Sequence, residues 1–60
     1  MTMRIFSEVE MFGTVFKHEH MQVFGDDLNV FGRVLAYHEY MHKEFPGKPF
    51  RLIKAEEVTV

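Results

Sequence analysis

Apolar and polar residues alternate along the first part of the chain, over residues 4–25. On one side of this alternation lie Ile5, Val9, Met11 and Val15, and on the other lie Phe6, Glu8, Glu10, Phe12 and Phe16. A period of two residues that is rich in Val, Ile and Phe and free of Pro is typical of β-strands. The segment is therefore predicted to form a β-hairpin.

The hairpin turn has two candidate positions. The polar run Lys17-His18-Glu19-His20 interrupts the apolar pattern and favours a turn there, followed by a second strand over residues 21–25. In this interpretation, Gly13 marks a bulge inside the first strand. The alternative places the turn at Gly13-Thr14, and then His18 and His20 belong to a strand.

The following segment changes to the helical period. The pair Asp26-Asp27 is suited to the N-terminus of a helix, because a carboxylate accepts backbone N–H bonds and its charge complements the helix dipole. An amphipathic helix is predicted over residues 28–45, and Pro46-Gly47-Lys48-Pro49 ends it. Its apolar half on the helical wheel consists of Leu28, Val30, Phe31, Val34, Leu35, Tyr37, His38, Met41, His42 and Phe45.

A third strand is predicted over residues 50–55, with Glu56-Glu57 interrupting it before residues 58–60. A right-handed crossover returns this strand parallel to the second one and places it beside the first. The predicted fold class is therefore α+β, with the element order β-β-α-β. We expect one small domain over residues 1–60, in which one helix packs on one face of a three-stranded antiparallel sheet of order 2-1-3.

One helix covers one face of such a sheet, so the other face should be open. The alternation places Phe6, Phe12 and Phe16 on that open face, and an exposed row of phenylalanines favours association. We therefore expect a contact with a protein partner or with a second copy of the chain, as a homodimer. The residues expected to flank this contact and set its specificity are Glu8, Glu10, Arg51 and Lys54.

Composition narrows the classes of function. The 60 residues include no cysteine, which excludes disulfides and thiolate zinc sites. The formal net charge is -2 and no basic stripe is present, which argues against direct binding to nucleic acid. No apolar run approaches the roughly 20 residues of a membrane span, and no signal peptide is evident. We expect a cytoplasmic protein that acts without a cofactor and away from membranes.

The run His38-Glu39-Tyr40-Met41-His42 matches the H-E-x-x-H pattern of zinc metallopeptidases, in which two histidines one helical turn apart bind the metal. A polar Lys43-Glu44 pair follows it, no third ligand has a characteristic spacing, and 60 residues leave no room for a substrate cleft. The chain is therefore expected not to be an enzyme. A second hypothesis is a structural zinc site formed by His18, His20, His38 and His42.

Two junctions resemble those of the very small proteins with which bacteriophages inhibit host enzymes. They are Val23-Phe24-Gly25-Asp26-Asp27-Leu28, between strand and helix, and Pro46-Gly47-Lys48-Pro49-Phe50-Arg51, between helix and strand. The resemblance spans residues 14–55 and concerns the layout of a hairpin, an acid-capped helix and a final basic strand. It implies a non-enzymatic module that binds a host protein surface, and it transfers no individual functional residue.

Overall fold

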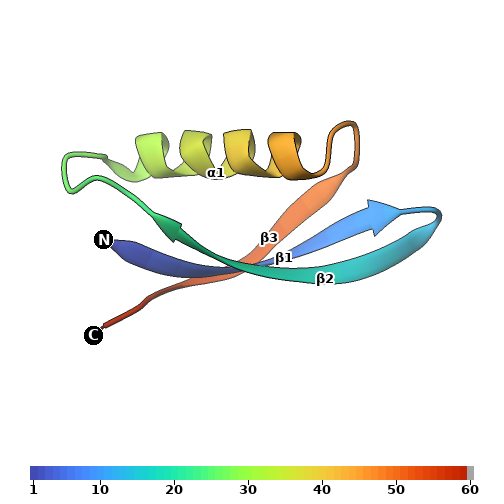
Figure 1. Ribbon diagram of the computed structural model, residues 1–60, viewed down its shortest axis with the longest axis horizontal. Helices are drawn as coiled ribbons and strands as arrows, with labels where there is room; N and C mark the ends of the chain where they lie inside the picture. Colours follow the sequence, from blue (N-terminus) through green and yellow to red (C-terminus); the bar gives the residue numbers. More distant parts are fainter. Residues whose placement is uncertain (60) are drawn as a thin grey trace.

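The computed structural model describes residues 1–59 and contains three strands and one helix. The elements are β1 (Thr2–Met11), β2 (Thr14–Val23), α1 (Val30–Glu44) and β3 (Phe50–Glu57). Figure 1 shows α1 lying over one face of a strongly twisted sheet. Both neighbours of β1 are antiparallel to it and the strand order is β2-β1-β3, which confirms the α+β fold predicted from the sequence.

The hairpin turn consists of two residues, Phe12 and Gly13, with φ angles of 54° and 73°. Two successive positive φ values are typical of the type I′ turn, whose twist matches that of the flanking strands. The strands pair from Met11 opposite Thr14 onwards, so the turn predicted at residues 17–20 is wrong and the alternative is correct to within one residue. Gly13 is a turn residue and not a bulge, because glycine readily adopts this conformation.

The core lies between α1 and the central strand. It consists of the buried side chains Ile5, Val9, Phe24, Tyr37 and Met41. Within it, the hydroxyl groups of Ser7 and Tyr37 lie 2.7 Å apart and form a buried hydrogen bond. This bond satisfies two polar groups that would otherwise be desolvated without a partner.

Only one of the three phenylalanines predicted for the open face of the sheet lies there. Phe6 points away from α1, between its neighbours on β2 and β3. Phe12 belongs to the turn, and Phe16 pairs with Val9, whose side chain is buried under the helix. The prediction fails for Phe12 and Phe16 because the turn at residues 12–13 restarts the alternation, and directly paired residues share a face.

Helix α1 begins later than the sequence predicted. Asn29 is its N-cap, and the Asn29 side-chain oxygen accepts a hydrogen bond from the backbone N–H of Gly32 at 2.8 Å. Asn caps a helix as well as Asp does, so the residue at the start of the helical turns has displaced the predicted Asp26-Asp27 cap. Asp26 instead accepts a bond from the N-terminal amine at 3.3 Å. At the other end, Phe45 is the C-cap.

The apolar half predicted for α1 is wider than the stripe that the sheet covers. Tyr37 and Met41 are buried, but Phe31 is 80% exposed and Leu35 is 64% exposed. Tyr40, which the helical wheel placed on the polar half, packs over β2 instead. A single sheet covers a stripe of roughly 100° on a helix, so the remaining apolar positions face solvent.

Strand β3 continues through Glu56 and Glu57, so the interruption predicted at these residues is wrong. Its irregularity lies earlier, where Lys54 pairs with Phe6 and Leu52 pairs with Ser7. Ile53 is therefore an extra residue, a β-bulge. The final predicted segment extends to Val60, which lies outside the described residues.

Within residues 1–59, no helix is both long enough and apolar enough to cross a membrane.

Candidate protein-interaction surface

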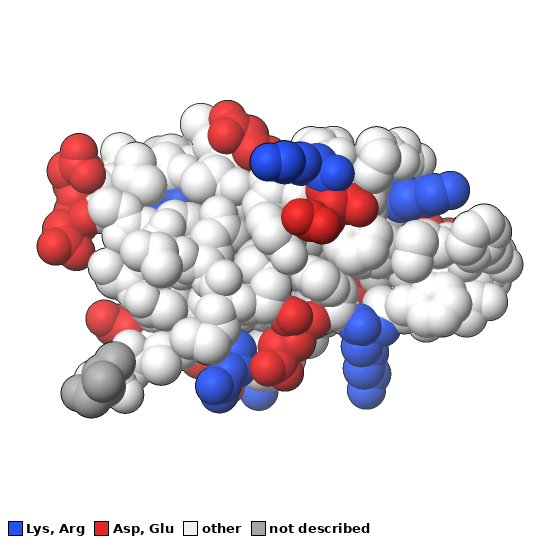
Figure 2. Space-filling view, viewed as in Figure 1, with Lys and Arg blue, Asp and Glu red and all other residues white. Residues whose placement is uncertain are grey.

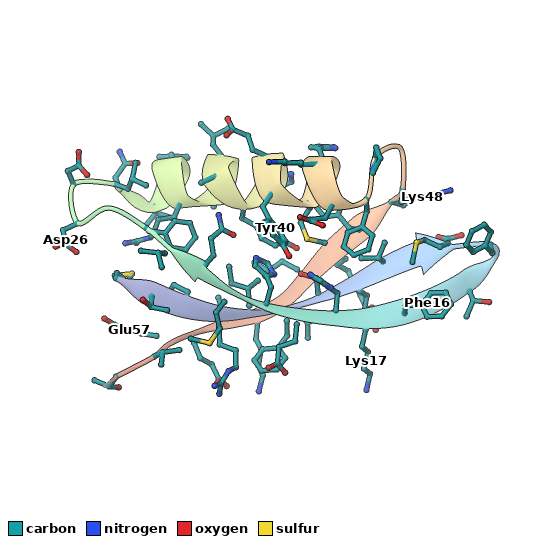
Figure 3. All side chains as sticks on the ribbon, in the orientation of Figure 1. Phe16, Lys17, Asp26, Tyr40, Lys48 and Glu57 are labelled. Carbon is teal, nitrogen blue, oxygen red and sulfur yellow. The ribbon has the colours of Figure 1, made fainter. Side chains whose placement is uncertain are left out.

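The open face of the sheet is charged. Figure 2 shows basic and acidic side chains along the lower margin of the molecule, on the side of the sheet away from α1, and Lys17 points to that side in Figure 3. Three ion pairs form there: Arg51 with Glu8, Arg4 with Glu19 at 3.7 Å, and Lys54 with Glu56 at 3.0 Å. The row of phenylalanines expected on this face is therefore corrected: the face combines these ion pairs with Phe6 and with the exposed side chains of Val15, Met21 and Val23 on β2.

Most of the residues predicted to surround a contact on this face interact with one another. The Lys54 amine lies 4.7 Å from the centre of the Phe6 ring, and Arg51 contacts Glu8. Glu10 has an exposed side chain, and its backbone N–H donates to the carbonyl of Pro49 at 2.9 Å. Exposed ion pairs of this kind each contribute about 0–1 kcal/mol to the free energy of unfolding, so they make the face polar without stabilising the fold much.

The tip of the hairpin presents the most exposed aromatic side chain among the described residues. Phe12 is 89% exposed and Phe16 is 46% exposed. The left-handed conformation of Phe12 costs a residue with a side chain about 1–2 kcal/mol, and a bulky residue adopts it rarely. Figure 1 shows that the hairpin extends beyond the C-terminal end of α1, so this tip protrudes from the body of the molecule.

On the β2 side of α1, aromatic rings close the space between helix and sheet. Tyr40 points from α1 towards the strands in Figure 3, and its ring stacks on His20 with centres 3.8 Å apart. The Tyr40 hydroxyl group lies 3.2 Å from Nε2 of His18. Burial and, next, the nearby His20 lower the pKa of His18, although Glu44 opposes this shift. Burial and the negative charge of Glu44 raise the pKa of Tyr40.

On the β3 side of α1, the space is open and forms an apolar groove of about 240 Å³. Val30, Val34 and His38 form its helix wall. Leu52 and Ala55 lie on its strand wall. The surface of the helix beyond the groove is also apolar, because Phe31 and Leu35 follow at helical spacing. We call the side chains of Phe31, Val34, Leu35 and His38 the helix flank.

The four histidines do not converge. His38 and His42 are exposed, with ring centres 6.2 Å apart, and each ring lies 5.2 Å from Phe50 on the β3 side. His18 and His20 lie on β2 and contact Tyr40. Within residues 1–59, no three potential ligands are grouped closely enough to hold a metal ion. The hypothesis of a zinc site formed by all four is therefore wrong, because the two pairs lie on opposite sides of α1.

Sequence reasoning missed the helix flank because it assigned every apolar residue of the helix to the core. A signal was nevertheless present. The predicted apolar half includes Leu28, Phe31, Leu35, His38 and His42, whose spacing follows a second line along the helix beside the one that Tyr37 and Met41 follow. Two apolar lines on one helix indicate two contacts, and the sheet supplies only one.

Comparisons with known proteins give no match. The chain matches no family model, and no curated protein or solved structure is similar to it at a significant level.

Proposed function

We propose that this protein is a non-enzymatic interaction module that binds a host protein in the cytoplasm and inhibits it, as the phage proteins with a similar layout do. The observation that carries the proposal is Phe12. Its side chain is 89% exposed, and it stands in a conformation that is unfavourable for a bulky residue. Strained, exposed positions of this kind are concentrated at sites that bind ligands or partners.

The fold itself gains little from Phe12. Asn or Asp followed by Gly is the common pair in a type I′ turn, and either would relieve the strain at this position. The ring of Phe12 is almost fully exposed, so it adds little to the core. A phenylalanine at this position is explained by a contact outside the molecule.

The shape of the hairpin suits insertion into a concave site. A few aromatic anchors that fill pockets provide most of the affinity of a typical protein interface. Phe12 offers such an anchor at the protruding tip, and Phe16 extends the apolar surface beside it. The Lys48 amine lies 5.3 Å from the centre of the Phe12 ring, so an apolar pocket with acidic residues at its rim is the complementary partner.

The layout shared with small phage inhibitors supports the same class of function. The hairpin, the single helix and the final strand lie in the expected order, although Asn29 caps the helix in place of an acidic residue. The charged open face is a weaker candidate for the main contact, since Glu8, Arg51 and Lys54 already pair within the chain.

The test uses the chain as bait in a host lysate, with proteins quantified by mass spectrometry. The decisive variant is Phe12→Asn, because Asn keeps the turn and removes the ring. The matched control is Phe31→Asn, which removes a similarly exposed phenylalanine from the helix. We expect a host protein that the wild type and Phe31→Asn retain and that Phe12→Asn loses.

A purified partner then allows a functional measurement. The wild-type chain should inhibit the activity of that partner, and Phe12→Asn should need at least roughly tenfold more protein for the same inhibition. The proposal is wrong if both variants retain every protein that the wild type retains.

A further inference from the structure

Three unpartnered features lie on the same side of the molecule. Strand β3 is an edge strand, because its one neighbour in the described sheet is β1. The apolar groove runs between β3 and α1, and the helix flank continues the apolar surface above it. An edge strand leaves backbone donors and acceptors available for another strand, and an exposed apolar surface favours association.

The opposite edge of the sheet, β2, also carries exposed apolar side chains, but within residues 1–59 no open groove lies between it and the helix. There, Tyr40 closes the space above β2 by stacking on His20, and its hydroxyl group contacts His18. A strand added at β2 would meet this closed aromatic layer. A strand added at β3 would lie below an open groove and an exposed helix flank. The β3 side is therefore the better docking surface.

We propose that the occupant is a second copy of this chain, paired antiparallel with β3 around a two-fold axis. In the proposed register, Leu52 lies opposite Ala55 of the second copy and Arg51 lies opposite Glu56. Arg51 already contacts Glu8 and Glu56 already contacts Lys54 within each copy, so this register extends the two ion pairs across the interface. The symmetry repeats each pair, so the interface contains two Arg–Glu pairs and two Leu–Ala pairs. Opposite charges and apolar side chains placed directly across an antiparallel pair favour that pairing.

The bulge in β3 makes this register possible. Arg51 and Glu56 pair with Glu8 and Arg4 of β1, so both point to the open face of the sheet. In a regular strand, two residues separated by an odd number of positions point to opposite faces. The extra residue Ile53 restores a common face for Arg51 and Glu56, and it does the same for Leu52 and Ala55 under the helix. The segments on either side of the bulge then pair, and the two bulges meet at the axis.

The helices fit the same arrangement. In each copy α1 packs on the central strand β1, since Tyr37 and Met41 cluster with Ile5 and Val9. Three strand spacings of about 4.8 Å would separate the two central strands, so the two helices would lie about 14 Å apart. Helices in direct contact lie 8–10 Å apart, so long side chains are needed to fill the gap. Phe31, Leu35 and His38 of the helix flank supply them.

Charge exchange tests the register. Arg51→Glu alone places like charges opposite each other at both ends of the interface, and so does Glu56→Arg alone. A mixture of the two variants restores opposite charges at both ends. Sedimentation equilibrium should show a wild-type dimer and each variant at least roughly tenfold weaker in self-association. The mixture should recover dimers close to wild-type affinity, and circular dichroism should confirm that each variant is folded.

The matched control is Lys17→Glu. Lys17 also pairs with Glu8, but on the β2 side, so this variant introduces a similar like-charge contact away from β3. It should dimerise like the wild type. Loss of the dimer in Lys17→Glu but not in Arg51→Glu would place the contact at β2 and overturn the proposal, as would a monomeric wild type or a mixture that remains monomeric.

This inference is independent of the proposed function, and the two can fail separately. Phe31→Asn should weaken the dimer because it removes a side chain of the helix flank, and Phe12→Asn should leave the dimer intact. Capture of the host protein should show the reverse pattern. A dimer that forms equally well with Phe31→Asn would contradict the proposed packing of the two helices.

Discussion

The two long sides of α1 meet the same sheet in different ways. On the β2 side, Tyr40 stacks on His20 and closes the layer. On the β3 side, Val34 and Leu52 stand on opposite walls of an open groove, and Phe31 lies beyond it in solvent. The strand order places β1 in the centre, so each side of the helix has one strand beneath it. The helix therefore carries more apolar surface than this small sheet covers.

The largest difference in stability is expected between a substitution on the buried side of α1, at Met41, and one in the helix flank, at Leu35. Met41 is completely buried, and Met41→Ala should lower the free energy of unfolding by about 2–5 kcal/mol, because it leaves a cavity in the core. Leu35 is mainly exposed, and Leu35→Ala should change the free energy of unfolding of the monomer by less than about 1 kcal/mol. Urea denaturation at low protein concentration measures both. Equal losses would show that the flank packs within the monomer.

A smaller difference in the free energy of unfolding is expected between substitutions on the two sides of α1, at Tyr40 and at His38. Tyr40→Ala should lower the free energy of unfolding by about 1–2 kcal/mol, since it removes the ring stacked on His20 and the hydroxyl group that contacts His18. His38→Ala should change it by less than about 0.5 kcal/mol, because His38 is exposed. Thermal unfolding of the two variants at matched concentration measures both changes. A larger loss of stability in His38→Ala than in Tyr40→Ala would contradict the conclusion that the β2 side is closed and the β3 side is open.

A substitution at the hairpin tip should stabilise the fold, whereas those in the helix destabilise it. Phe12→Asn should raise the free energy of unfolding by about 1 kcal/mol, because Asn tolerates the left-handed conformation better than Phe. Phe12→Ala serves as a control, since it removes the ring without relieving the backbone. If Phe12→Asn destabilises the fold, the ring contributes to folding and the argument for an external partner is lost.

The smallest expected effect is a pH dependence of stability that arises at His18 on the β2 side. The pKa of His18 lies below its ordinary value of 6.5 in the folded chain, because burial and the neighbouring His20 disfavour the charged form. The unfolded chain therefore binds more protons as the pH falls through 6.5, so the folded state loses stability there and the loss is complete below the folded pKa.

The measurement compares the wild type with His18→Asn in urea at about pH 8 and about pH 5. The wild type should lose more stability between these two values than the variant does. An equal loss in both proteins would assign the pH dependence to groups other than His18.

The sequence was sufficient for the order of elements and the topology. Alternation, the Pro-Gly-Lys-Pro stop and the right-handed crossover rule together led to a sheet of order 2-1-3, which the structure confirms. On β1, the pattern also separated Ile5 and Val9 under the helix from Phe6 and Glu8 on the open face. These predictions succeed because they depend on local periods that tertiary contacts reinforce.

The position of the turn could not be decided in the same way, and the error spread to the candidate site. A polar run resembles a turn, but on this edge strand Lys17 and Glu19 face solvent, and His18 and His20 pack against Tyr40. Moving the turn to Phe12-Gly13 reversed the predicted faces of Val15 and Phe16 in β2. The bulge at Ile53 was equally hidden, because a single extra residue is defined by the pairing with β1 and not by the sequence of β3 alone.

The most direct test of the contrast between the two sides of α1 is a dilution series followed by two-dimensional amide NMR, from about 1 mM to about 10 μM protein. We expect the amide signals of β3 and of residues 30–38 to shift with concentration and those of β2 to stay constant. Shifts confined to β2, or a spectrum that does not change anywhere, would contradict the proposal that the open side of the helix binds a second copy.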